Sequence, residues 1–93
     1  MKYNIKLLLF SSPQCGPCIA LDRILIKLIK NRPFSLKKIN VNKNPDMATY
    51  YAVAGVPTTL AVDQNGKLLA SMFGSSSTQG VEEWLDYVED SSI

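Results

Sequence analysis

The spacing of apolar residues predicts that the first half of the chain folds as a strand, a helix and a second strand. Residues 5–10 form a nearly continuous apolar run, which is typical of a strand buried on both faces. From Cys15 to the residue before Asn31, apolar positions recur every three to four residues, which predicts a core-facing helix. Residues 34–41 predict the second strand. This succession implies a parallel βαβ unit.

The start of a second helix is predicted at Asn44. Its side chain can cap the helix, Pro45 gives up an amide that would have no partner there, and Asp46 lies at the positive end of the helix dipole. The apolar side of this helix extends to Ala54. We therefore expect Gly55 to end it in the left-handed conformation.

A hairpin and a last helix are predicted to complete the fold. Residues 56–62 read as a third strand, and Asn65-Gly66 is a hairpin signal that returns the chain along 68–73. Thr78 is then a candidate cap for a helix with one apolar side. The predicted order is β-α-β-α-β-β-α, an α/β fold with a four-stranded mixed sheet flanked by three helices.

Composition indicates one ordinary globular domain over residues 1–93. Hydrophobic residues make up 46% of the chain and charged residues 19%, which excludes a disordered or coiled-coil protein. The formal net charge of the chain is +2, and its ten basic residues are spread among eight acidic ones. We therefore expect neither nucleic acid nor a membrane as a partner, and we expect a monomer.

The beginning of the chain does not fit a secretory signal. Its uninterrupted apolar run covers only Leu7 to Phe10, whereas a signal core needs about 7 to 15 apolar residues. We expect a cytoplasmic protein. In that compartment, a close pair of cysteines indicates catalysis more often than scaffolding.

Cys15 and Cys18 are the only cysteines, and they enclose Gly16 and Pro17. If this segment forms the first turn of a helix, the two sulfurs can close to a disulfide and reopen, which carries two electrons. Zinc needs about four ligands, and the chain has no histidine. A structural disulfide across so short a loop would add only about 2 kcal/mol of stability. A redox pair is therefore favoured over these alternatives and over two inert thiols.

The position of each cysteine predicts a different role. At the start of a helix, unpaired amides and the dipole stabilise an anion by about 0.3 to 2 kcal/mol, which favours a thiolate on Cys15. Cys18 lies one turn further on and is more shielded, so it is suited to attack a mixed disulfide formed by Cys15. Pro17 is tolerated in a first turn, and Gly16 lets a partner approach.

A second candidate site residue is Pro57, which follows Gly55 and Val56 at the entry to the third strand. Proline in a strand interior removes a ladder hydrogen bond, so we expect it at the first strand residue, with a cis peptide bond. An ordinary turn proline is the alternative.

These motifs together resemble the thioredoxin family. The resemblance is carried by four segments in order, namely Cys15-Gly16-Pro17-Cys18, residues 40–45, Val56-Pro57-Thr58 and Asn65-Gly66. It implies that Cys15 is the attacking thiol, Cys18 the resolving thiol and Pro57 a cis-proline that helps to hold a substrate backbone. We expect no cofactor, and the shortage of ligands for zinc leads us to expect no metal. The resemblance also matches Lys38 to a lysine near the active site and implies a substrate surface made of Gly16, Pro17, Val56, Pro57 and Gly74.

The chain departs from the family pattern at several places. The strand and helix that usually precede the first strand are missing, which gives a compact, glutaredoxin-sized protein. Ser11 and Gln14 stand where aromatic residues are common, and Leu9 stands where the family has a buried acid. Because leucine cannot ionise, we expect Cys15 to govern the pH profile of disulfide reduction.

Three functions follow from these observations. The leading hypothesis is reduction of protein disulfides, with electrons returned by a flavoprotein thioredoxin reductase or by glutathione. The second is a glutathione-dependent, glutaredoxin-like enzyme, although residues 74–77 lack the second glycine and acidic pair usual at that site. The third is a non-catalytic module that uses the fold to bind a partner enzyme.

Overall fold

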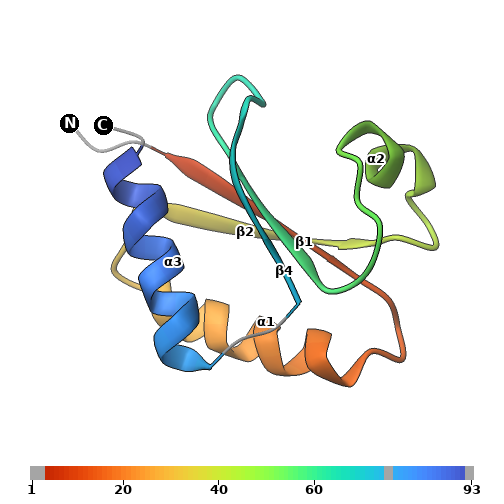
Figure 1. The fold of residues 1–93 in the computed structure, drawn as a ribbon, viewed down its shortest axis with the longest axis horizontal. Coiled ribbons are helices and arrows are strands. Elements are labelled where there is room, and N and C mark those ends of the chain that lie inside the picture. The colour runs from red at the N-terminus through yellow and green to blue at the C-terminus, as the bar shows by residue number, and fades with distance from the viewer. Residues whose placement is uncertain (1–3, 75–76, 92–93) are drawn as a thin grey trace.

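Four strands form one mixed sheet in the computed structural model, which describes residues 4–74 and 77–91 (Figure 1). The order of elements confirms the predicted β-α-β-α-β-β-α succession. The elements are β1 (Ile5–Ser11), α1 (Gly16–Leu28), β2 (Phe34–Asn40), α2 (Pro45–Tyr50), β3 (Thr58–Val62), β4 (Leu68–Phe73) and α3 (Thr78–Ser91).

Strand β1 lies at the centre of the sheet, whose order is β2-β1-β3-β4. It runs parallel to β2 and antiparallel to β3, and β4 returns antiparallel to β3. The βαβ unit predicted from the first half of the chain is therefore confirmed. Antiparallel pairing with β3 brings the end of β1 next to the start of β3, because Phe10 pairs with Thr58.

Alternate side chains of β1 supply two separate cores. Leu7 and Leu9 face a cluster that also contains buried residues of α1 and α3, such as Leu21 and Leu85. Leu8 and Phe10 face a second cluster, against which Met47, Ala48 and Tyr51 of the α2 region pack. Helices α1 and α3 thus cover one face of the sheet and α2 the other (Figure 1). The uninterrupted apolar run of β1 follows from burial on both sides.

The prediction that Gly55 ends the second helix is wrong, because α2 already ends at Tyr50. Ala52 takes the left-handed conformation, with φ 56°. The amide of Val53 donates to the carbonyl of Ala48 at 2.8 Å, and that of Ala52 to Thr49 at 3.1 Å, which is the pattern of a Schellman motif. The constraint on Gly55 is space, since a Cβ atom there would lie 3.1 Å from the ring of Phe73.

Two predicted helix caps also differ from the structure. Asn44 precedes α2, but its side chain makes no cap bond and instead donates from Nδ2 to the carbonyl of Asn40 at 3.0 Å. For α3 the cap is Ser77 rather than Thr78, because the amide of Gly80 donates to Ser77 Oγ at 3.1 Å. Several polar side chains compete at each helix start, and the spacing of apolar residues does not decide between them.

The hairpin between β3 and β4 forms where Asn65-Gly66 predicts it. Gly66 has φ 82°, in the left-handed region that favours glycine. Asp63 Oδ1 accepts hydrogen bonds from the amides of Asn65 and Lys67, at 2.8 and 2.9 Å. The third strand begins at Thr58 rather than Val56, so Pro57 precedes the strand instead of being its first residue.

One substitution made at two glycines tests the backbone of this fold. Gly66→Ala should destabilise the protein by about 1 to 2 kcal/mol, because an L-residue is strained at a left-handed φ. Gly16→Ala should change stability by less than about 1 kcal/mol: the site is helical and open and alanine restricts the unfolded chain, but Pro17 disfavours helical angles for an alanine before it. Urea unfolding of the oxidised proteins measures both, and equal destabilisation would contradict the assigned conformations.

Candidate active site

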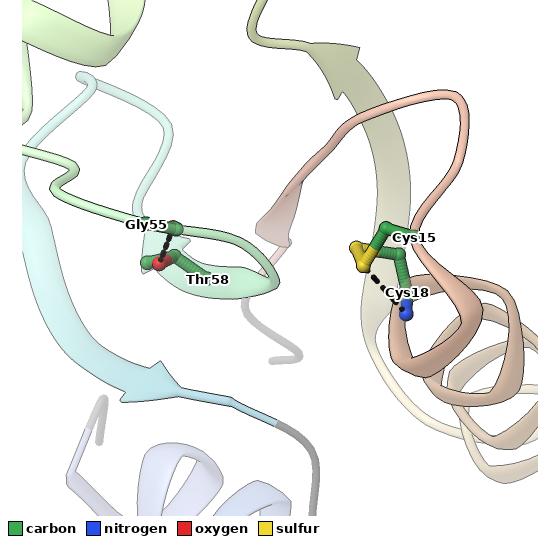
Figure 2. The surroundings of a disulfide bond; sticks show 4 residues. All are labelled: Cys15, Cys18, Gly55 and Thr58. Carbon is green, nitrogen blue, oxygen red and sulfur yellow. Dashed lines mark hydrogen bonds between the residues drawn. A yellow bond between two sulfur atoms is a disulfide. The ribbon is translucent and has the colours of Figure 1, made fainter.

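Cys15 and Cys18 form a disulfide at the start of α1, with their Cα atoms 5.2 Å apart (Figure 2). Cys15 is the N-cap residue and keeps extended backbone angles, φ −102° and ψ 101°. Gly16 and Pro17 are then the first two helical residues, where a missing proline amide removes no helical hydrogen bond. The helix starts here because Ser11 ends the strand and residues 12–15 reverse the chain direction.

The two sulfur atoms lie in different surroundings. The backbone amide of Cys18 donates to Cys15 Sγ at 3.1 Å, so one of the unpaired amides of the helix start points at this sulfur. Cys15 is half-buried, whereas Cys18 is only 3% exposed. The arrangement gives Cys15 access to a partner and a donor for a negative charge. Cys18 has neither.

The segment before β3 lies at the same end of the sheet as the disulfide, as Figure 2 shows with Gly55 and Thr58. The Val56–Pro57 peptide bond is cis, which confirms the prediction from sequence. Thr58 Oγ1 donates to the carbonyl of Gly55 at 2.6 Å, which ties the segment to itself. The amide of Gly74 donates to the carbonyl of Pro57 at 2.8 Å.

The structure therefore joins Pro57 to Gly74, two residues that the resemblance assigns to the substrate surface. Gly74 has φ 78°, and a Cβ atom added there would meet nothing within 4 Å, so its backbone is open to an approaching chain. Gly16 and Pro17 are exposed beside the cysteines, while Val56 is half-buried. Lys38 contacts none of these residues through a described bond. Its Nζ pairs with Asp22 Oδ2 at 3.2 Å.

Sequence reasoning missed two residues near this site. Phe73 is 74% exposed and immediately precedes Gly74, so it adds an apolar ring to the surface. Asp22 lies on α1 with 20% of its side chain exposed. The signal was present for Asp22, because it comes four residues after Cys18 and three before Leu25, both of which are buried. An acid at that spacing lies beside the inward side of the helix.

Two further features bear on what the site can bind. Within residues 4–74 and 77–91, no group of three or more histidine, cysteine, aspartate or glutamate side chains could hold a metal ion. No helix in that part of the chain is long and apolar enough to cross a membrane.

Comparison with known proteins agrees with this geometry. The thioredoxin family model matches residues 2–87. A thioredoxin of Buchnera aphidicola from Acyrthosiphon pisum is 32% identical over 79 residues, covering 83% of this chain and 72% of the relative. Thioredoxin 2 of Chlorobaculum tepidum is 29% identical over 85 residues, covering 89% and 77%. The chain belongs to the thioredoxin family.

Solved thioredoxin structures share the fold. A mutant thioredoxin from Halobacterium salinarum superposes with a TM-score of 0.82 at 24% identity, covering 94% of this chain and 76% of that one. The oxidised mitochondrial thioredoxin 3 of Saccharomyces cerevisiae gives 0.78 at 26% identity, covering 91% and 79%. The four-stranded sheet with three helices is therefore a thioredoxin fold. Together with the disulfide, the family makes this protein a thiol–disulfide oxidoreductase.

The asymmetry of this thioredoxin-family cysteine pair predicts which thiol reacts first. Limiting iodoacetamide at neutral pH should alkylate Cys15 of the reduced protein roughly tenfold faster than Cys18, because Cys15 is accessible and faces an amide donor. Peptide mass spectrometry locates the label. The variants Cys15→Ser and Cys18→Ser, alkylated separately, give each rate alone, and faster labelling of Cys18 would reverse the assignment.

Proposed function

We propose that this protein reduces disulfide bonds in other proteins by cycling Cys15 and Cys18 between dithiol and disulfide. The observation that supports it is the disulfide itself, which joins a half-buried Cys15 at a helix start to a buried Cys18. A disulfide that closes only four residues adds little stability. Its placement at the helix start suits reversible chemistry.

The cycle uses each thiol once. The thiolate of Cys15 attacks one sulfur of a substrate disulfide, forms a mixed disulfide and releases the first substrate thiolate. Cys18 then loses its proton and attacks Cys15 Sγ, so the bond from Cys15 to the substrate breaks and the second substrate thiolate leaves. The substrate gains two electrons, and the protein ends as the disulfide seen here.

The proposed substrate surface surrounds the exposed side of the disulfide. It combines Gly16, Pro17, Val56, Pro57 and Gly74, and we add Phe73. The bond between Gly74 and Pro57 holds two of these segments together, and the exposed ring of Phe73 offers an apolar contact to a substrate chain. An extended peptide fits this surface because open backbone at Gly74 leaves room for main-chain approach.

A reductant must return two electrons after each turnover. We propose a flavoprotein thioredoxin reductase for this step, with glutathione as the alternative donor. The proposal places this single domain in the cytoplasm, because a pair that donates electrons has to be kept reduced between turnovers.

A paired assay tests the proposal against its competitors. The protein should accelerate insulin reduction by dithiothreitol, and should show little activity on a small glutathione mixed disulfide. Cys15→Ser should abolish the insulin activity, because it removes the attacking sulfur, while Cys18→Ser should trap a mixed disulfide on Cys15. Activity on the glutathione substrate alone would favour a glutaredoxin-like enzyme. Retained biological function in the Cys15→Ser, Cys18→Ser double variant would favour a binding module.

A further inference from the structure

Asp22 has one carboxylate oxygen whose burial the fold alone does not explain. Oδ2 pairs with Lys38 Nζ at 3.2 Å, but Oδ1 is buried and has no hydrogen-bond partner among the described residues. Leaving a buried acceptor unpaired costs about 1 to 3 kcal/mol, and more when it is charged. Unpaired buried groups in a native protein are few, and a catalytic role is one reason to keep them.

Asp22 lies on α1 one helical turn after Cys18. Residues four apart on a helix have Cβ atoms about 5 to 6 Å apart, and Asp22 follows Cys18 by four. Helical side chains lean towards the N-terminus and cover the preceding turn. This general geometry places the carboxylate of Asp22 within reach of the turn that holds Cys18, and Cys18 is itself 3% exposed.

The sheet beneath α1 supplies the remaining neighbours. Leu9 pairs with Lys38 on β2 and with Thr59 on β3, so these three side chains form one row on the face that α1 covers. Thr59 Oγ1 is the other buried side-chain atom that lacks a partner among the described residues. Both unpaired oxygens thus belong to the layer between α1 and the sheet.

The oxidised state leaves Cys18 without a proton to donate. In the disulfide, Cys18 Sγ is bonded to Cys15 Sγ and carries no hydrogen. Reduction gives Cys18 a thiol whose S–H can donate. We propose that Asp22 is the proton acceptor of Cys18 during resolution of the mixed disulfide, an inference that rests on the proposed dithiol cycle.

In this step the proton of Cys18 passes to Asp22 Oδ1, and the carboxylate becomes a carboxylic acid. The resulting thiolate attacks Cys15 Sγ, the Cys15–Cys18 bond forms and the bond from Cys15 to the substrate breaks. The substrate sulfur leaves with the electron pair and is protonated by Asp22 or by water. Atoms and electrons balance without another reactant.

Lys38 is the charged group that faces Asp22 from the sheet. On α1 itself, Cys18 lies one turn before Asp22, and Cys15 is the N-cap residue about two turns before it. From β1 and β3 come Leu9 and Thr59, which carry no charge. α3 presents the apolar residues Val81 and Leu85 to this core. Lys38 pairs with the carboxylate, while its 58% exposed side chain stays in contact with water. Leucine at position 9 predicts that Cys15 alone sets the pH profile of disulfide reduction. With Asp22 as proton acceptor, the rate at which Cys18 resolves the mixed disulfide depends less steeply on pH.

The test separates the two steps with the chromogenic disulfide dithiobisnitrobenzoate. Reduced protein should release one nitrothiobenzoate when Cys15 attacks and a second when Cys18 resolves, which stopped-flow absorbance follows across about pH 5.5 to 9. Asp22→Asn should leave the first release unchanged and slow the second at least about tenfold near pH 6. The difference should vanish above about pH 8.5, where a cysteine thiol ionises unaided.

Control variants distinguish proton transfer from a structural role. Asp46→Asn makes the same change at an exposed site on α2, across the sheet, and should leave both releases unchanged. Asp22→Glu keeps a carboxylate and should restore part of the second rate near pH 6. A second release slowed equally at every pH, or unchanged within twofold, would overturn the proposal.

Two further outcomes are decisive without the asparagine variant. If Asp22→Asn does not fold, the pH dependence of the second release in the wild-type protein decides. A rate that rises tenfold per pH unit up to about pH 8 overturns the proposal, because a thiol without a base reacts in proportion to its thiolate fraction. A rate of second release that rises less steeply with pH, in both the wild type and Asp22→Glu, supports the proposal. If the wild-type protein completes both releases but does not reduce insulin, the proposed reduction of protein disulfides is wrong. The proposed role of Asp22 is then still supported.

Discussion

The burial of β1 on both faces is the constraint on which the rest of the structure depends. Alternate leucines of this strand hold α1 and α3 on one side and α2 on the other, so neither layer can shift without exposing core. Burial of each leucine side chain contributes about 1.5 to 3 kcal/mol to the stability of the folded state. The end of β1 consequently fixes where α1 begins, and with it the position of Cys15. Its pairing with β3 fixes Pro57 at the same end.

Much of the fold could be predicted from the sequence because burial leaves a periodic signal. The apolar run of β1, the inward stripe of α1 and the Asn65-Gly66 turn each correspond to an element found in the structure. The cysteine pair and the cis bond at Pro57 were also accessible, since both involve residue types with few alternative uses. Each of these features depends on one residue type or on a repeating pattern, so it can be predicted from a single sequence.

Helix ends and the surroundings of Cys18 could not be predicted in the same way. Asn44 and Ser77 each compete with neighbouring polar residues for the same backbone groups, and small differences in geometry decide the outcome. The spacing of Asp22 from Cys18 and Leu25 places it beside the inward side of α1, but spacing alone gives it no partner. The pairing that gives it meaning, with Lys38 of β2, joins residues sixteen apart and depends on the register of two strands.

The contrast between Leu9 and Asp22 shows where the fold can hold a carboxylate: on α1, one helical turn from Cys18. Leu9 is 0% exposed on the central strand, where an ionised acid would lose its water and cost several kcal/mol without a close partner. Asp22 is on the covering helix, where 20% of its side chain reaches solvent and one oxygen already pairs with Lys38. The helix position keeps one oxygen paired with Lys38 at the edge of solvent while the second oxygen stays buried.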